Sequence, residues 1–328
     1  MSAEKTVMVT GAAGMIGSHL VDRLLSQGYV VYGLDIVPLA SCHNLDNARD
    51  NADFHYTEGD IRSPEVVTAF FRPEASCLYH LAAVVGVRKY MDDPLSLIDI
   101  TIMGTRNLAA LCDKHRVRIL FTSTSEVYGR NPKVPWKEDD DRVLGATNVD
   151  RWSYSTSKAV CEHMLFGIHH KTGLPISIVR FFNVYGPRQN PIYVASQTVY
   201  RVLKGERPDI YDGGRQTRCF TYVDDVISGV IAAATSPAAI GQVINLGNTV
   251  ETPVGDVVRL TLHHAGSDMA PVEVSTSEKY GAVYEDIIRR VPDASKAERL
   301  LGWKATTLVS EGLKKTLEWA KANPWYLA

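Results

Sequence analysis

The chain has 328 residues, of which 45% are hydrophobic and 22% charged, and its formal net charge is −2. These values are typical of a soluble globular protein and argue against a nucleic-acid surface or a polybasic membrane patch. Because the N-terminus lacks a secretion signal, no apolar run approaches roughly 20 residues, and five scattered cysteines form no CxxC, we expect a cytoplasmic protein with reduced thiols. The ten histidines form no HExxH or His/Cys cluster, so we expect no metal site.

Short apolar runs alternate with stretches of helical length over the first half of the chain. The expected strands are TVMVTG, YVVYGLD, DFHYTEGD, CLYHLAA, RILFTST and PISIVRFFN, and long helical patterns cover 94–115 and 155–172. This alternation predicts an α/β fold with a doubly wound, Rossmann-type parallel sheet over residues 1–183.

The pattern becomes irregular after residue 183. The strand QVINLGN is expected to rejoin the main sheet, so segments near 219–248 complete it. Helices near 224–235, 253–265 and 293–322 then form a smaller mixed α/β cap, and 184–328 is mostly a substrate-binding region. Because the chain re-enters the sheet, the boundary is approximate.

A glycine-rich turn lies between the first strand and the first helix. In VTGAAGMIGSHL, Gly11, Gly14 and Gly17 permit a tight turn, close approach of the backbone to a pyrophosphate, and helix–strand packing. Asp35 ends the second strand, 18 positions beyond Gly17. A carboxylate there would accept hydrogen bonds from ribose hydroxyls and repel a 2′-phosphate, which favours NAD over NADP.

Asp60 ends the third strand, where it could contact the adenine amine or cap the helix that begins at SPEVV. The predicted NAD-binding residues are Gly11, Gly14, Met15, Ile16, Gly17, Asp35, Asp60, Ile61, Leu81, Ala82, Ala83, Tyr154 and Lys158.

A second set of polar residues follows the fifth strand. FTSTSE ends that strand with hydroxyls and a carboxylate, and Tyr154 and Lys158 are four apart at the start of the next long helix. Residues at this spacing share a helix face. A neighbouring lysine cation stabilises a phenolate, so Tyr154 could remove a proton from a sugar hydroxyl that it shares with Thr124.

These motifs occur in the order typical of a known family. TGxxGxxG, HLAA, STSEVYG, YxxxK, RFFNVYGPR and TRCFTYVDDV together resemble the extended short-chain dehydrogenases/reductases that act on nucleotide sugars, over essentially the full length. The resemblance implies an enzyme that holds NAD and oxidises the sugar at C4 to a 4-keto intermediate. Epimerisation, dehydration or decarboxylation then precedes return of the hydride.

The residues after the fifth strand bear on which reaction follows. Thr124, Ser125 and Glu126 resemble the Thr-Ser-Glu of UDP-glucuronate decarboxylases and UDP-apiose/xylose synthases. Glucose-type 4,6-dehydratases carry an aspartate in the middle position, GDP-mannose-type dehydratases share Thr-Ser-Glu, and simple 4-epimerases usually lack the glutamate. DRWSYSTSK and the C-terminal YGAVYEDIIRRVPD also resemble the decarboxylase branch. The preferred reaction is therefore decarboxylation of UDP-glucuronate to UDP-xylose or a UDP-4-keto-pentose.

On that mapping, Arg290 faces the sugar carboxylate or the diphosphate, and acts with Thr124, Ser125, Glu126, Tyr154 and Lys158 in catalysis. Asn183 and Arg218 hold the uridine diphosphate, and Tyr284 lines the same pocket. Tyr90, four residues before a proline, also matches a substrate-binding position. In alternative interpretations Arg290 is a surface residue, Tyr90 packs a loop, and Glu126 caps a turn.

One departure keeps a second reaction open. After GPR the chain reads QNPIYVASQ, which is shorter than in the decarboxylases and resembles glucuronate 4-epimerases, in which an arginine pins the carboxylate. Arg188 could act so here. The alternative function is therefore a UDP-glucuronate or UDP-hexose 4-epimerase. A 4,6-dehydratase is weakened by the missing aspartate, and a non-catalytic NAD-sensing scaffold is opposed by the intact Thr124, Tyr154 and Lys158. The resemblance also implies a homodimer through helices 94–115 and 155–172.

Overall fold

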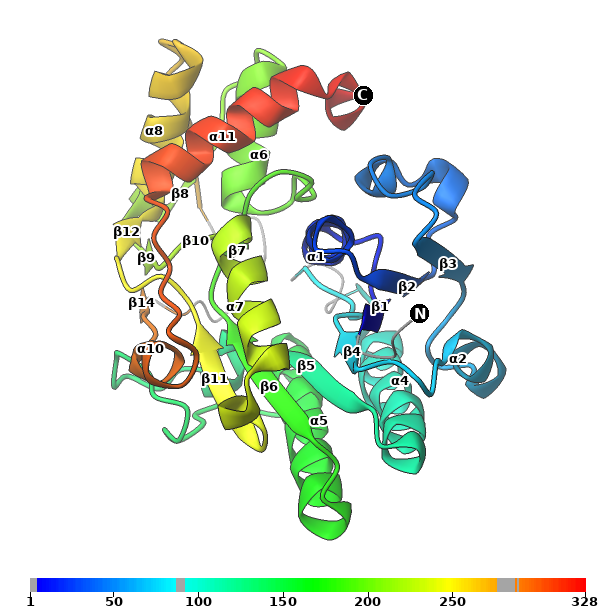
Figure 1. The fold of residues 1–328 in the computed structure, drawn as a ribbon. Coiled ribbons are helices and arrows are strands. Elements are labelled where there is room, and N and C mark those ends of the chain that lie inside the picture. The colour runs from blue at the N-terminus through cyan, green and yellow to red at the C-terminus, as the bar shows by residue number, and fades with distance from the viewer. Residues whose placement is uncertain (1–4, 87–91, 276–286, 288) are drawn as a thin grey trace.

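A parallel sheet forms the centre of the molecule (Figure 1). The computed structural model describes residues 5–86, 92–275, 287 and 289–328. Seven parallel strands lie in the order β11-β6-β5-β4-β1-β2-β3. Their bounds are β1 Thr6–Thr10, β2 Val30–Asp35, β3 Phe54–Glu58, β4 Cys77–His80, β5 Arg118–Thr124, β6 Ile176–Phe181 and β11 Gln242–Leu246. The predicted doubly wound parallel sheet is confirmed.

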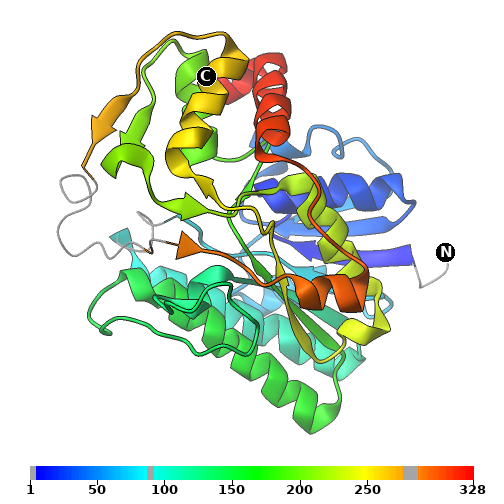
Figure 2. The same cartoon turned by 90° about the vertical axis from the view of Figure 1, so that its left-hand side faces the viewer.

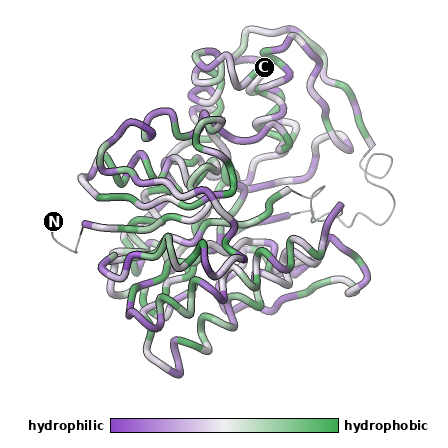
Figure 3. Tube along the Cα trace, turned by 90° about the vertical axis from the view of Figure 1, so that its right-hand side faces the viewer, coloured by the Kyte–Doolittle hydropathy of each residue, from purple (hydrophilic) through white to green (hydrophobic). Residues whose placement is uncertain are grey.

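Helices cover both faces of this sheet (Figure 2). They are α1 Met15–Ser26, α7 Val223–Thr235 and α10 Ser295–Leu301 on one face, and α2 Pro64–Phe70, α4 Pro94–His115 and α5 Arg151–Thr172 on the other. Each face has its own apolar core, and apolar residues follow the buried strands in Figure 3. Such burial on both faces explains why the strands read as apolar runs rather than as alternating patterns.

The smaller part of the molecule is built from short strands and three mutually packed helices. The helices are α6 Val194–Leu203, α8 Val254–Ala265 and α11 Val309–Ala322. The strands are β7 Val184–Tyr185, β8 Asp209–Tyr211, β9 Thr217–Arg218, β10 Thr221–Tyr222, β12 Thr252–Pro253, β13 Val272–Val274 and β14 Arg289–Arg290. Strand β11 returns from this region to the edge of the main sheet beside β6. The division of the chain at residue 183 remains a prediction.

Helix α4 is long and apolar enough to cross a membrane when judged by length and composition alone. The sequence-based expectation that no stretch approaches this length therefore needs correction. Asp93 caps the helix by accepting from the Ser96 amide, and Pro94 occupies its first turn. Because α4 packs against α5 and contributes buried residues to one core, its apolar residues fit a helix of a soluble fold.

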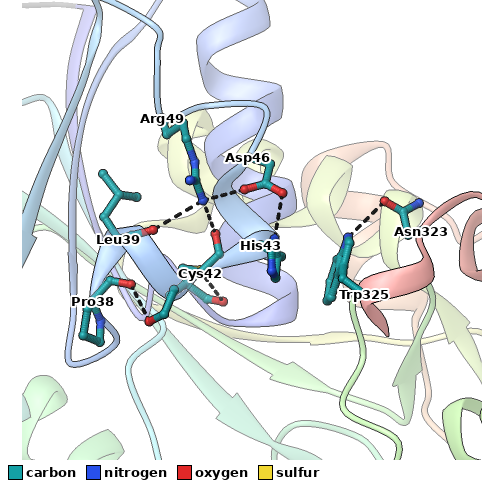
Figure 4. Close-up of polar contacts among 10 residues, drawn as sticks. Pro38, Leu39, Cys42, His43, Asp46, Arg49, Asn323 and Trp325 are labelled. Carbon is teal, nitrogen blue, oxygen red and sulfur yellow. Dashed lines mark hydrogen bonds and ion pairs between the residues drawn. The ribbon is translucent and has the colours of Figure 1, made fainter. Parts of the chain in front are cut away.

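The C-terminus contacts the sheet domain next to α1 (Figure 4). The ring of Trp325, in the short helix η7 (Pro324–Leu327), stacks on His43 at a centroid distance of 4.9 Å. His43 also pairs with Asp46, which holds Arg49 in turn. Further along the same boundary, His19 on α1 bonds the carbonyl oxygen of Pro187 at 3.2 Å. The cap therefore contacts both helix α1 and the segment around His43 that follows β2.

A buried ion pair joins helix α5 to strand β6. Arg180 donates from Nε and Nη2 to the two carboxylate oxygens of Glu162, at 3.0 and 2.6 Å. Ser123, on β5, donates to the same carboxylate at 2.5 Å. The bidentate geometry and the hydroxyl compensate for the loss of hydration of both charges. This pair fixes α5 relative to the ends of two central strands.

Removing one partner should therefore unfold the protein more easily. We expect Glu162→Gln to lower the free energy of unfolding by about 3 kcal/mol, because Arg180 would keep a buried, uncompensated charge. Chemical denaturation measures the change. The matched control is Glu311→Gln, which breaks an exposed ion pair with Lys315 on α11. It should leave the free energy of unfolding nearly unchanged. Equal effects from the two variants would contradict this account.

Candidate active site

Two positions of the glycine turn, Gly11 and Gly17, have no room for a side chain. Gly11 has a φ of +74°, and a Cβ added there would lie 2.7 Å from the Ala82 amide nitrogen. A Cβ on Gly17 would lie 1.9 Å from the carbonyl oxygen of Gly11. Gly14 is the N-cap of α1 and supplies no side-chain cap. The first amides of the helix, including those of Met15 and Ile16, therefore face a turn where an anion can approach the backbone.

Asp35 lies beside this turn at the end of β2. Its carboxylate accepts from the Ala13 amide at 3.0 Å and from the Val37 amide at 3.3 Å. Burial raises the pKa of Asp35, and these backbone bonds oppose the shift. A carboxylate has about four acceptor sites, so Asp35 can still accept from a ribose hydroxyl.

Asp60 is bound to a neighbouring side chain. Arg62 donates to it from Nε at 2.9 Å and from Nη2 at 2.6 Å, and this interaction lowers the pKa of Asp60. Helix α2 is instead capped by Ser63, which accepts from the Val66 amide. The interpretation of Asp60 as that cap is therefore wrong.

The predicted cofactor residues lie together at the carboxyl ends of β1, β2, β3 and β4. Leu81 donates to the carbonyl of Thr10, which brings Ala82 against Gly11, and Ala83 follows. The carbonyl of Ile61 accepts from Asn107 of α4 at 3.1 Å. An uncapped helix start, a turn that only glycine fits and an acidic strand end suit the pyrophosphate and ribose of NAD.

Thr124, Tyr154 and Lys158 meet where β5 ends against α5. The side chains of Thr124 and Tyr154 are hydrogen-bonded. The ammonium of Lys158 donates to the carbonyl of Thr122 at 2.7 Å and lies over the Phe121 ring. The three residues are buried, as a site that excludes water requires.

The sequence led to the expectation that the Lys158 cation lowers the pKa of Tyr154, but that pKa is raised in this structure. Burial lowers the pKa of Lys158 to about 8. Burial, together with the nearby Tyr193 and the charge of Glu126, raises the pKa of Tyr154, although its bond with Thr124 opposes the shift. The phenol is therefore protonated at neutral pH in this arrangement, and a positive charge must come close before it can act as a base.

Glu126 lies in a short helix, η4 (Ser125–Tyr128), between two arginines. Oε1 pairs with Nη1 of Arg290, and Oε2 lies 3.4 Å from Nη2 of Arg151. Burial alone would raise the pKa of Glu126, but Arg290, Arg151 and Arg218 together hold it below the ordinary value. The turn-cap interpretation of Glu126 is wrong, because Thr124 caps η4, and Arg290 is not a surface arginine.

The strand that carries Arg290 is held from both sides. Arg290 pairs in register with Arg218 of β9, so the two arginines are neighbours on one small sheet. On the other side, the amide of Trp136 donates to the carbonyl of Val291 at 2.8 Å. Buried Asn245 donates to the carbonyl of Trp136 and accepts from Tyr128 of η4. Strand β11 therefore connects the Glu126 turn to the Arg290 strand.

The remaining predicted substrate residues have distinct surroundings. Ser125 is buried in η4. The buried amide nitrogen of Asn183 has no hydrogen-bond partner in the described part of the chain, as suits a donor to a ligand. Arg188 donates to Asp22 of α1 at 2.6 Å. Tyr90 and Tyr284 lie outside the described residues.

Two residues of the site were not predicted from the sequence. Arg151 pairs with Glu126, and Tyr193 couples to the Tyr154 phenol. The position of Arg151, three residues before Tyr154 on one helix, was the available signal, since such residues lie on neighbouring faces. Tyr193 offered none, because it lies in the irregular part of the chain.

The glycine turn gives a direct test of the cofactor site. We expect the purified protein to carry NAD(H), and Gly17→Ala to abolish this, because the new Cβ overlaps the Gly11 carbonyl. Absorbance and mass analysis of released nucleotide measure occupancy. Gly167→Ala is the control, since a Cβ there meets nothing within 4 Å on α5. Bound NADP, or full NAD occupancy in Gly17→Ala, would contradict the assignment.

Comparisons with known proteins agree with this geometry. A family model described as GDP-mannose 4,6 dehydratase matches residues 8–316. A UDP-N-acetyl-alpha-D-glucosaminuronate decarboxylase of Bacillus cytotoxicus is 32% identical over 96% of this chain and 98% of its own. UDP-glucuronic acid decarboxylase 1 of Xenopus tropicalis is 31% identical, and the match covers 96% of this chain and 72% of its own.

Solved structures give the same result. The UDP-glucuronic acid 4-epimerase of Bacillus cereus, solved with UDP-glucuronic acid and NAD, is 30% identical with a TM-score of 0.86, covering 97% of this chain and 99% of its own. The UDP-glucose 4-epimerase of Thermotoga maritima is 29% identical with a TM-score of 0.87 and the same coverage. The chain therefore belongs to the GDP-mannose 4,6-dehydratase family of extended short-chain dehydrogenases/reductases, which are NAD-dependent enzymes that modify nucleotide sugars.

Proposed function

We propose that this enzyme is a UDP-uronate decarboxylase, which converts UDP-glucuronate or a close relative to UDP-xylose or a UDP-4-keto-pentose. The observation that carries the proposal is the buried carboxylate of Glu126 held by Arg290 and Arg151. Simple removal and return of hydride at C4 requires no such group beside Tyr154.

The first half of the reaction uses the group at the end of β5. NAD, when bound, supplies the hydride acceptor for C4 of the sugar. Tyr154 takes the proton of the C4 hydroxyl, and Thr124, its hydrogen-bond partner, holds that hydroxyl in place. Lys158, with a pKa of about 8, supplies the positive charge that stabilises the phenolate.

The second half uses the ion pair. Oxidation at C4 makes the sugar carboxylate part of a β-keto acid, so loss of CO₂ leaves an enolate that must be protonated at C5. Glu126 is ionised while both arginines hold it, because they lower its pKa. When Arg290 turns to the substrate carboxylate, the pKa of Glu126 rises, so the carboxylate can take up a proton from solvent and then donate it to C5 of the enolate.

The charges of the site favour an anionic sugar. Arg151, Arg218 and Arg290 surround one glutamate, so positive charge is in excess. A uronate carboxylate would balance part of that excess, whereas a neutral hexose would not. Asn183 and Arg218 are proposed to hold the uridine diphosphate, and Tyr90 and Tyr284 to line the pocket. Both curated relatives named above are decarboxylases of UDP-linked uronic acids.

A UDP-glucuronate 4-epimerase is the second candidate. The GPRQ segment and the similarity to the Bacillus cereus epimerase favour it. In that reaction Arg188 would hold the carboxylate and prevent its loss. Arg188 is bonded to Asp22, so this role would require it to leave that partner.

One experiment separates the two candidates. UDP-glucuronate and UDP-N-acetylglucosaminuronate labelled with ¹³C at C6 are incubated with the enzyme, without added NAD, and products are followed by NMR and mass spectrometry. Labelled CO₂ together with a pentose product supports decarboxylation. Retention of the label with inverted C4 would assign the enzyme as an epimerase.

The ion pair generates a prediction about rate. We expect Glu126→Gln to slow CO₂ release at least about 100-fold, the lower range for general acid–base assistance, while NAD content is unchanged. The control is Glu251→Gln, which breaks the exposed pair with Arg289, the neighbour of Arg290 on β14. That variant should stay within about twofold of wild type, since exposed pairs contribute little. Near-normal turnover in Glu126→Gln would exclude this mechanism.

We also propose a cytoplasmic homodimer. Leu95 and Met103 of α4 and Val160 of α5 are exposed on helices that pack together. Pairing with a second copy would cover these residues in a four-helix bundle.

Light scattering at micromolar concentration should give the mass of two chains. The double variant Met103→Glu/Val160→Glu should give one chain with NAD still bound, because like charges would then face each other across the interface. Sedimentation of the wild-type protein with lipid vesicles, or a monomer mass for the wild type, would contradict the proposal.

A further inference from the structure

The two arginines that hold Glu126 differ in how buried they are and where they come from. The side chain of Arg290, on β14, is 11% exposed, whereas that of Arg151 is 2% exposed. Arg151 is the first residue of α5, and its guanidinium also lies over the Trp152 ring. Arg290 is thus the partner that an incoming ligand can reach, and Arg151 is the partner enclosed by protein.

Arg151 also shares a helix with the catalytic tyrosine. Tyr154 follows three residues later and Lys158 seven residues later, both in the first turns of α5. An ion pair from Arg151 to Glu126 therefore sets the position of the carboxylate relative to the group that acts at C4. In this way a single rigid helix locates both reacting parts of the site.

We propose that Arg151 positions Glu126 and provides its permanent counter-charge, so that Arg290 can turn to a substrate carboxylate without leaving a buried, unpaired anion. This inference rests on the proposed decarboxylation, because only that reaction requires Arg290 to be shared. Breaking a buried pair completely is costly, whereas exchanging one of two partners is not. Arg151 is a positioning residue in this account and does not touch the sugar.

The charged and titratable groups that face Glu126 define what a titration would report. Among the described residues they are Arg290 from β14, Arg218 from β9, and Arg151 and Tyr154 from α5. Removing Arg151 takes away one positive charge and leaves the other groups in place. The carboxylate of Glu126 then becomes less stable, and its titration midpoint must move to higher pH.

Two variants test the role. Arg151→Met removes the charge, and Arg151→Lys keeps a cation without the planar fork of donors. Protein labelled with ¹³C at the glutamate side-chain carboxyl is titrated by NMR, with the Glu126 signal assigned by its loss in Glu126→Gln. The rate of CO₂ release and the Michaelis constant for UDP-glucuronate are measured over the same pH range.

We expect Arg151→Met to raise the titration midpoint of Glu126, because a positive charge is lost. We expect it to lower kcat by at least about tenfold, because the carboxylate is no longer held in place relative to Tyr154, while KM changes less than kcat. In Arg151→Lys the titration midpoint of Glu126 should lie close to that of the wild-type protein. The control is Arg142→Met, because Arg142 donates to the carbonyl of Val127 beside Glu126, not to its carboxylate. It should leave the midpoint unchanged.

The inference is overturned if Arg151→Met leaves the Glu126 midpoint unchanged, or if Arg151→Lys behaves like Arg151→Met. If Arg151→Met does not fold, the midpoint and kcat of Arg151→Lys decide between these outcomes. A wild-type enzyme that releases no CO₂ would refute the proposed function instead. In that case the NMR midpoints still show whether Arg151 holds Glu126.

Discussion

The buried carboxylate of Glu126 is the constraint on which the candidate active site depends. Removing such an ion from water costs several kcal/mol, so the fold must bring it compensating charge. The partners come from β14, far along the chain, and from the start of α5. Strand β14 reaches this position only because it pairs with β9 and because Trp136 and Asn245 hold its other side. The cap, the loop before α5 and the edge strand β11 must therefore all fold correctly before Glu126 can be ionised.

The same carboxylate connects two chemical tasks. Its charge, after burial and the nearby Tyr193, raises the pKa of Tyr154 and so opposes loss of the phenolic proton. The arginines keep Glu126 ionised, so oxidation at C4 needs a separate positive charge, that of Lys158, to stabilise the phenolate. Decarboxylation by this fold therefore requires arginines beside Glu126, because without them the buried carboxylate would not be ionised.

Local motifs predicted the parts of the molecule in which neighbours in sequence are neighbours in space. The turn at Gly11, Gly14 and Gly17 and the helical pair Tyr154 and Lys158 are of this kind, as is the alternation that indicates the parallel sheet. Contacts across long separations could not be read in the same way. The pairing of Glu126 with Arg290 and of Arg188 with Asp22 depends on how the cap folds back onto the sheet. The pKa of Tyr154 also required burial to be known, because burial dominates its shift.

On one fold, whether the sugar carboxylate is kept or lost can depend on which arginine binds it. An arginine that only binds the carboxylate, with no acid near C5, stabilises the ground state and protects the bond to C6. An arginine taken from a glutamate, as Arg290 would be, couples carboxylate binding to a rise in the pKa of that glutamate, which can then take up the proton that C5 needs. In this chain Arg188 donates to Asp22 of α1, and Arg290 pairs with Glu126. Arg151 would remain as a partner of Glu126 when Arg290 leaves, so this chain can free one arginine for a carboxylate and still hold Glu126 in place, which is the combination that the proposed loss of CO₂ requires.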